Sequence, residues 1–197
     1  PTQVMNTSSC FLIFVLCFSC CYGQSIPPKG WPTAWNATIS VTMSDTVIGA
    51  PATTYYDSTR LMQATFFSQC AIAGGIVNNE PCVQVQSSVS GNFGIWTITG
   101  DTCCIDFAHV GYLIPSWPSD LEYVGIQQVF GQEAIHYAGG SPDLHDYYVT
   151  NDANQVPIFV GPEEWTWFSG WSVGPQPDVF SSLMPISSCT SNCTASQ

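Results

Sequence analysis

Apolar and polar residues alternate along most of the chain. The clearest case is Ile39-Ser40-Val41-Thr42-Met43-Ser44, in which every second side chain is apolar. Because successive side chains of a β-strand point to opposite faces, this alternation predicts a strand with one buried face. Further β runs follow at 53–56, 60–67, 83–86, 93–98, 105–110, 124–130, 134–137, 146–150, 158–160 and 165–173. Short strands with frequent turn signals, and no convincing amphipathic helix, predict an all-β sandwich or barrel.

Turn-forming residues divide the chain further. Asp57-Ser58-Thr59 separates two β runs and predicts a hairpin, in which we expect Asp57 to hold Arg60 in a structural pair. Pro115, Trp117 and Pro118 interrupt the pattern at 113–122, which predicts a loop. We expect a Pro- and Gly-rich lead-in at 24–35, one β domain at 36–180, and a cysteine-held tail at 181–197.

The N-terminal 23 residues have the pattern of a signal peptide. From Cys10 to Tyr22 the chain reads CFLIFVLCFSCCY, an apolar run that is too short to span a bilayer. We expect Met5 to be the initiator and cleavage to fall near Gly23–Gln24, although no Lys or Arg precedes the run. The alternative is a buried core helix. The prediction is a secreted protein without a transmembrane anchor.

The scarcity of positive charge limits the classes of partner that the protein can bind. Only 8% of the residues are charged, Lys29 and Arg60 are the only two cations, and the net charge is -12. A surface of this sign repels phosphate backbones, which argues against nucleic-acid binding and against anionic membranes.

Six cysteines remain after the predicted cleavage: Cys70, Cys82, Cys103, Cys104, Cys189 and Cys193. An even number in an exported chain predicts disulfides, and no spacing typical of a zinc site is present. We expect Cys70 to pair with Cys82. Adjacent Cys103 and Cys104 would point to opposite faces of a strand, so we expect them to take different partners, Cys189 and Cys193. Sequons at Asn36 and Asn192 predict a glycoprotein.

The order of landmarks from Trp31 onward resembles a family of secreted plant and protist proteins distantly similar to ependymin and to LolA-type lipoprotein carriers. The landmarks are Trp31-Pro32, Tyr56-Asp57 with Arg60, Thr102-Cys103, Phe107, Val110-Gly111, Pro115-Ser116-Trp117, Tyr123-Val124-Gly125, Val129-Phe130-Gly131, Tyr147-Tyr148, Val156-Pro157 and Cys189. The chain departs from the pattern where plant members have a Cys near Ala134, and in adding Cys104 and Cys193. The disulfide pairing is therefore not transferred from the family.

The resemblance implies a strongly curved antiparallel sheet, or two stacked ones, that forms a half-barrel around an apolar pocket. It implies binding of a lipid or another hydrophobic molecule, and ependymin-related proteins are calcium-responsive, glycosylated and dimeric. We therefore consider a homodimer and bound calcium as expectations that follow from the resemblance. Some plant members carry a label of glycosyl transfer. This chain lacks the Asp-x-Asp motif that such an activity normally requires, so the label receives no support from the sequence.

No catalytic site can be identified from the sequence. Glu163 and Glu164 are adjacent, so on a strand they face opposite ways and do not form a glycosidase pair. No Gly-x-Ser-x-Gly elbow accompanies the three histidines, and His109 fits a structural role. We expect no catalytic residues and lean against an enzyme, although a hydrolase site scattered along the chain stays an alternative.

Two candidate sites remain. Asp143, Asp146 and Asp152 lie in a loop-rich region, and oxygen ligands on loops favour calcium over zinc. Aromatic residues are more numerous than a plain sandwich core needs, and Trp165 and Trp167 share a face by the two-residue period, which Trp171 joins only if no bulge intervenes. The hypothesis is a secreted, non-catalytic binder of a hydrophobic ligand, with extracellular carbohydrate or matrix binding as the alternative. The predicted pocket residues are Trp96, Phe107, Tyr123, Tyr148, Trp165 and Trp167.

Overall fold

The computed structural model describes residues 26–43, 46–72, 75–78, 80–88, 94–108, 114–139, 145–161, 164–183, 185–189 and 191–193. The strands are β1 (Ala34–Met43), β2 (Thr46–Asp57), β3 (Met62–Phe67), β4 (Cys70–Ile72), β5 (Gly75–Asn78), β6 (Cys82–Ser87), β7 (Gly94–Thr99), β8 (Thr102–Ala108), β9 (Leu121–Val129), β10 (Gln132–Gly139), β11 (His145–Thr150), β12 (Pro157–Gly161) and β13 (Glu164–Val173). Short 3-10 helices follow at η2 (Trp117–Asp120), η3 (Phe180–Ser182) and η4 (Ile186–Ser188). The predicted signal peptide, residues 1–23, lies outside this range.

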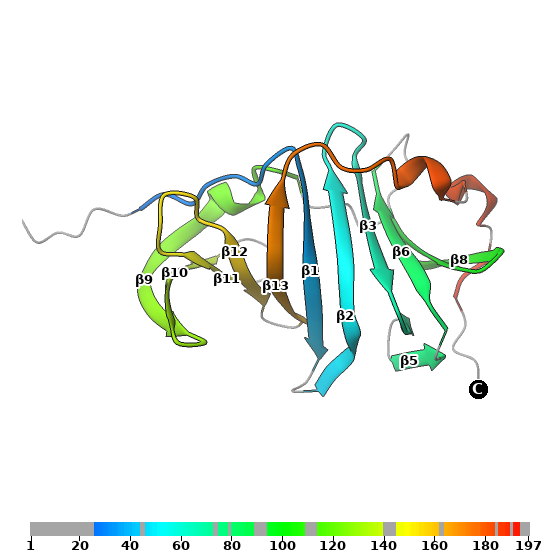
Figure 1. Cartoon of the computed structure of the whole chain (residues 1–197), viewed down its shortest axis with the longest axis horizontal. Coiled ribbons are helices and arrows are strands. Elements are labelled where there is room, and N and C mark those ends of the chain that lie inside the picture. Colours follow the sequence, from blue (N-terminus) through cyan, green and yellow to red (C-terminus); the bar gives the residue numbers. More distant parts are fainter. Residues whose placement is uncertain are drawn as a thin grey trace, which may run out of the picture.

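One antiparallel sheet of eleven strands forms most of the described structure, in the order β8-β7-β6-β3-β2-β1-β13-β12-β11-β10-β9, and β4 and β5 pair in a separate two-stranded sheet. Figure 1 shows β13, β1 and β2 in the middle, with β9 and β8 toward opposite ends. The sheet is not closed, because β8 and β9 are its two edges. The prediction of an all-β, disulfide-stapled fold is confirmed. No helix within the described residues is long and apolar enough to cross a membrane.

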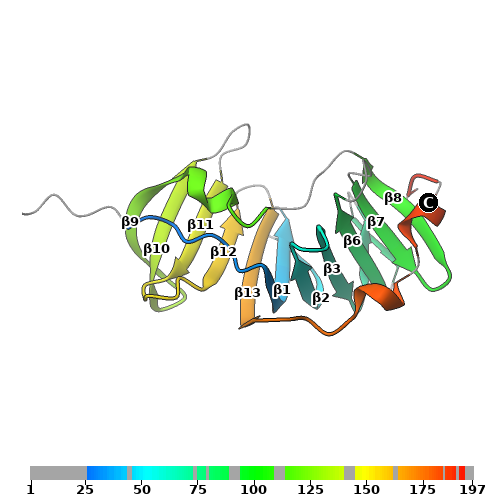
Figure 2. The same ribbon diagram turned by 90° about the horizontal axis from the view of Figure 1, so that it is seen from above.

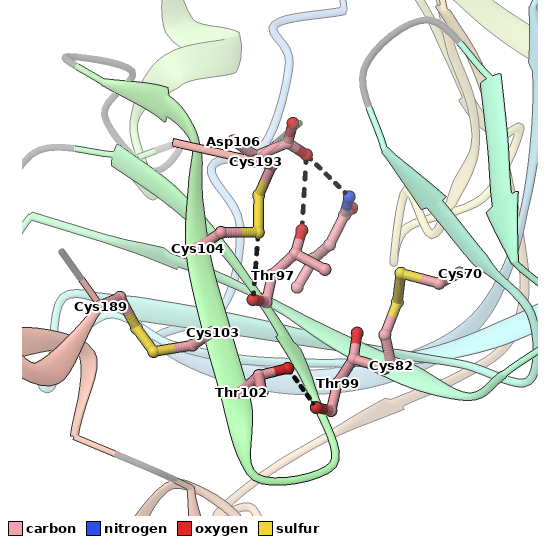
Figure 3. The surroundings of a disulfide bond; sticks show 11 residues. Cys70, Cys82, Thr97, Thr99, Thr102, Cys103, Cys104, Asp106, Cys189 and Cys193 are labelled. Carbon is pink, nitrogen blue, oxygen red and sulfur yellow. Dashed lines mark hydrogen bonds between the residues drawn. A yellow bond between two sulfur atoms is a disulfide. The ribbon is translucent and has the colours of Figure 1, made fainter. Parts of the chain in front are cut away.

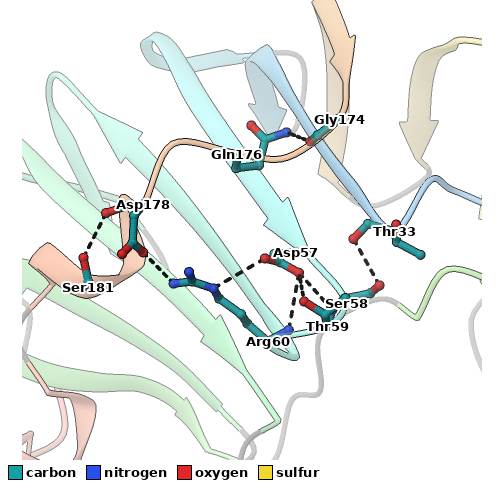
Figure 4. A network of polar contacts seen from close by, with 9 residues as sticks. All are labelled: Thr33, Asp57, Ser58, Thr59, Arg60, Gly174, Gln176, Asp178 and Ser181. Atoms are coloured by element: carbon teal, nitrogen blue, oxygen red, sulfur yellow. Dashed lines mark hydrogen bonds and ion pairs between the residues drawn. The ribbon is translucent and has the colours of Figure 1, made fainter.

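The β2–β3 hairpin shows how turn chemistry sets the register. The Asp57 carboxylate accepts a hydrogen bond from the Thr59 amide at 2.9 Å, and Asp57 pairs with Met62 across the hairpin. The predicted hairpin is confirmed, but Arg60 lies in the turn because β3 begins at Met62. The Arg60 guanidinium contacts Asp57 at 3.5 Å, as expected, and also binds Asp178 at 2.7 Å (Figure 4). This second contact ties the hairpin to the C-terminal segment, which follows β13 from Gly174 onward.

The lead-in packs against one face of the sheet, which we call the lead-in face. Figure 2 shows this segment, in blue, passing along the β9–β12 half of the sheet. Its Trp31 ring contacts Trp35 and Tyr56 edge-on at 5.1 and 5.8 Å. The main hydrophobic cluster forms here, from Trp31, Trp35, Ala37, Ile39, Ala52, Tyr56, Leu121, Ile135, Tyr137, Tyr147 and Val149. The lead-in is therefore part of the core rather than a loose approach to it.

The C-terminal segment crosses the other half of the sheet, on the opposite face, which we call the tail face. It runs from β13 toward β8 (Figure 2). Gln176 accepts a hydrogen bond from the Asn36 side chain at 2.8 Å, and Phe180 is buried beside Arg60, whose guanidinium lies 5.5 Å from the ring centre. The two halves of the sheet are thus covered from opposite sides by the two ends of the described chain.

Two disulfides hold the C-terminal segment around edge strand β8. Cys103 bonds to Cys189 and adjacent Cys104 bonds to Cys193, so one bridge lies on each face of the strand (Figure 3). Between the bridges, Asn192 forms an isolated parallel bridge with Ile105. The third disulfide joins Cys70 to Cys82 and fixes the small β4–β5 hairpin, which the sequence pattern does not predict. The expected pairing of Cys70 with Cys82 is confirmed, as is the bonding of the adjacent pair Cys103 and Cys104 to Cys189 and Cys193, while the structure assigns which of the two each one takes.

Candidate functional site

A cleft of about 890 Å³ opens where the C-terminal segment crosses the tail face. Strands β2, β3, β6 and β7 supply its floor through paired residues, since Thr53 lies opposite Phe66, Phe66 opposite Val83, and Val83 opposite Ile98. Ser182 and Leu183 of the C-terminal segment line its other side. Its full lining is Pro51, Thr53, Phe66, Phe67, Ser68, Pro81, Cys82, Val83, Ile98, Gly100, Asp101, Ser182 and Leu183.

The cleft is open to solvent and its lining is mixed. Phe66, Val83 and Leu183 are half-buried and Ile98 is buried, so apolar side chains form part of the lining, and polar atoms expose nearly as much of it. Hydroxyl groups on Thr53, Ser68 and Ser182 add a few polar contacts. Ligand sites typically combine a mostly apolar lining with a small number of polar groups.

A row of aromatic rings crosses the tail face over strands β10 to β13. His136 of β10 stacks on Tyr148 of β11 at 4.3 Å, and Tyr148 contacts Phe159 of β12 at 5.3 Å. Phe159 in turn contacts Trp167 of β13 at 4.3 Å. Cross-strand neighbours of this kind stabilise sheets, so a packing role accounts for the row itself.

Phe130 covers the end of this aromatic row. It lies at the β9–β10 turn with a positive φ of 51°, followed by Gly131 at 79°, and such backbone is strained for a side chain as large as Phe. Its ring is 74% exposed and lies 4.4 Å from that of Trp167. Because β11 and β12 separate β10 from β13 in the sheet, this contact shows that the sheet coils back on itself here.

Four of the predicted pocket residues have described side chains, and these four lie in different parts of the sheet. Tyr148 and Trp167 both contact Phe159, whereas Tyr123 packs on the lead-in face, 6.2 Å from Tyr137. Trp96 is buried on β7, opposite Val85, in the other half of the sheet. The side chains of Phe107 and Trp165 lie outside the described residues.

A bulge separates Trp171 from Trp167. Pairing between β1 and β13 shifts between Asn36 and Thr38, and beyond the shift Trp171 stacks on Trp35 at 4.3 Å in the main core. Sequence reasoning also missed the cleft. Val83 and Ile98 stand in predicted strands, but no local pattern indicated that Leu183 would lie beside them.

The candidate calcium ligands contact other groups. The Asp146 carboxylate accepts a hydrogen bond from His136 Nε2 at 2.7 Å, and the Asp152 carboxylate accepts one from the Asn154 amide at 2.7 Å. Asp143 lies outside the described residues. No group of three or more His, Cys, Asp or Glu that could hold a metal occurs in the part of the chain that the structure describes. Calcium binding stays a prediction.

The two sequons differ in their surroundings. Asn36 is half-buried on β1 and donates a hydrogen bond to Gln176, whereas Asn192 is exposed beside Cys193. A glycan on Asn36 would be attached to Nδ2, the atom that donates the hydrogen bond to Gln176 in the C-terminal segment. Glycosylation at either residue stays a prediction.

A second pocket, of about 420 Å³, lies beside the lead-in. Trp31, Tyr147, Trp171 and Gln155 line it, and the Trp31 indole donates a hydrogen bond to the Tyr147 hydroxyl at 3.0 Å. Burial raises the pKa of Tyr147 far above its ordinary value, because an ionised phenolate there would lose its contact with water.

This buried phenol predicts a loss of stability in alkali. The pKa of Tyr147 is higher in the folded protein than in the unfolded chain, where it is near 10.0. The stabilising contribution of the neutral phenol is therefore complete below pH 10, and it is lost progressively as the pH rises above 10. Between about pH 10 and pH 12, we expect the free energy of unfolding to decrease less steeply with pH in Tyr147→Phe than in the native protein. Urea titrations at several pH values measure this, and parallel curves for the two proteins would contradict it.

Comparison with known proteins supports the fold and no particular activity. No protein-family model and no curated protein matches the chain. An uncharacterized conserved protein from Thermus thermophilus has a similar structure, with a TM-score of 0.50 and 13% identity over 80% of this chain and 88% of its own. The plant and protist family and ependymin receive no support from these comparisons.

Two more distant solved structures align over much of the chain. A DUF1329 family protein from Desulfovibrio piger ATCC 29098 is 9% identical, with a TM-score of 0.35 over 71% of this chain and 85% of its own. The MucA/MucB complex of Pseudomonas aeruginosa gives 15% identity and a TM-score of 0.32, over 82% of this chain and 59% of that one. TM-scores this low carry no argument about function.

Proposed function

We propose that this protein is a secreted, non-catalytic binding protein for a hydrophobic or lipid-like small molecule, which it holds in the cleft beneath the C-terminal segment. The cleft itself is the observation that carries the proposal. Its volume of about 890 Å³ falls in the range of small-molecule sites, roughly 300–1,000 Å³. Transfer of an apolar ligand from water to Phe66, Val83, Ile98 and Leu183 would be favourable, at about 25 cal/mol for each Å² buried.

The disulfides support this proposal in two ways. Three disulfides fit an oxidising compartment, either extracellular or periplasmic. The bridge from Cys189 to Cys103 also fixes the C-terminal segment that supplies one wall of the cleft, so the site exists before a ligand arrives. A preformed site favours affinity, because little ordering is needed on binding.

Leu183 tests the proposal, since it lines the cleft from the C-terminal segment. Titration with the apolar fluorophore N-phenyl-1-naphthylamine should give saturable binding to the native protein. We expect Leu183→Ser to weaken binding about tenfold, because the ligand loses roughly the burial of one leucine side chain.

Leu61→Ser is the matched control. Leu61 is 40% exposed in the β2–β3 turn and does not line the cleft, so its loss should leave the affinity unchanged. Urea midpoints of both variants show whether either is unfolded. Absence of saturable binding to the native protein, or equal weakening by both substitutions, would contradict the proposed function.

Carbohydrate binding is the second candidate, and Phe130 is the observation that favours it. A strained, 74% exposed Phe next to the half-buried Trp167 offers ring faces on which a sugar could stack. We would then expect soluble glycans to quench tryptophan emission in the native protein but not in Trp167→Ala. Quenching that the substitution leaves intact would exclude this surface.

A further inference from the structure

The lining of the cleft carries a negative charge and no positive one. Among the described residues that line it, Asp101 is the only ionisable one, because Cys82 is bonded to Cys70. Asp101 is exposed in the turn between β7 and β8, where its carboxylate can remain in water at the edge of the cleft. Glu80, also exposed, directly precedes the lining residue Pro81.

The two cations of the chain are engaged elsewhere. The Arg60 guanidinium binds Asp178 at 2.7 Å and contacts Asp57 at 3.5 Å. The Lys29 ammonium donates to the Ala153 carbonyl, beside the second pocket on the lead-in face. Neither residue belongs to the lining, so the carboxylate or phosphate head of an anionic lipid would meet no Lys or Arg there.

From this arrangement we infer that the ligand of the cleft is a cationic amphiphile, whose alkyl tail lies among Phe66, Val83 and Ile98 and whose ammonium head lies beside Asp101. The inference rests on the proposed function and adds the chemical class of the ligand. Opposite charges near a protein surface attract, while a carboxylate head would be repelled by Asp101 and by the net charge of -12.

Amphiphiles with one alkyl chain and different heads separate the classes. Dodecylammonium, dodecanol and dodecanoate would each displace N-phenyl-1-naphthylamine from the native protein, at low ionic strength and below their micelle concentrations. We expect dodecylammonium to bind about fivefold more tightly than dodecanol, and dodecanoate to bind most weakly. Added salt should reduce the differences, since exposed charges are screened.

The variant Asp101→Asn tests whether the Asp101 carboxylate causes the preference for an ammonium head group. It should weaken dodecylammonium binding about fivefold and leave dodecanol binding unchanged, because only the charge is removed. Asp120→Asn is the matched control, since it removes an equal charge from an exposed residue at the end of η2, in the other half of the molecule.

Each outcome bears on one proposal. Equal binding of dodecylammonium and dodecanoate, or equal effects of the two substitutions, would overturn the inference but leave the proposed function in place. Failure of the native protein to bind the fluorophore and all three amphiphiles would overturn the proposed function itself. A preference for dodecanol over both ions would assign the cleft to neutral amphiphiles and would also overturn the inference.

Discussion

Removing the disulfides Cys103–Cys189 and Cys104–Cys193 together is expected to lower the free energy of unfolding by about 6 kcal/mol, while removing either one costs only about 2 kcal/mol. The bridges close loops of nearly equal length, with sequence separations of 86 and 89. While one bridge remains, the long loop is still closed in the unfolded chain, and the other adds only a small ring. The entropy of the long loop is released only when both are absent.

Cysteine-to-alanine variants measured by urea denaturation test this non-additivity. The matched control is removal of Cys70–Cys82, which closes a loop with a sequence separation of 12 and should cost about 3 kcal/mol, additively with either of the others. If removing both bridges lowered the free energy of unfolding by no more than the sum of the two single removals, the bridges would not share one loop. Such a result would also question whether they hold the C-terminal segment together.

Trp31→Ala is the second large effect, with an expected loss of about 4 kcal/mol. Trp31 is 6% exposed and contacts Trp35, Tyr56 and Trp117 with ring centres 5.1–5.8 Å apart. Truncation leaves a cavity in the largest cluster and leaves the Tyr147 hydroxyl without its indole donor. The lead-in then loses its main anchor, so proteolysis near residues 27–33 should accelerate along with the fall in stability.

Trp31→Phe separates packing from hydrogen bonding. An aromatic ring is retained while the donor to Tyr147 is lost, so we expect a smaller cost, roughly 1–3 kcal/mol. If the alanine variant unfolded at the native urea midpoint, the lead-in would not be part of the core.

Local pattern was enough to predict most strands, because each needs only alternation and a turn. The run from Ile39 and the hairpin around Asp57 lie in β1 and in β2–β3. Adjacent Cys103 and Cys104 also predicted a bridge on each face of one strand, since neighbouring side chains of a strand diverge. The β4–β5 hairpin was missed because its short strands lack a clear alternation.

The sequence by itself determined the all-β class, the divergence of Cys103 and Cys104 and the scarcity of positive charge, since these follow from residue type and nearest-neighbour alternation. Which of Cys189 and Cys193 each of them takes was decided by the tertiary structure. Only the tertiary structure decided which aromatic residues meet. Alternation specifies two faces within a strand, but bulges change which residues lie opposite one another in neighbouring strands. One bulge lies next to Tyr137, in the pairing of β10 with β9 that places Tyr123 on the lead-in face. Another, in the pairing of β1 with β13, separates Trp171 from Trp167. The cleft likewise depends on residues far apart in the sequence, because Leu183 lines it together with Ile98 only when the C-terminal segment crosses the sheet and its cysteines bond to β8.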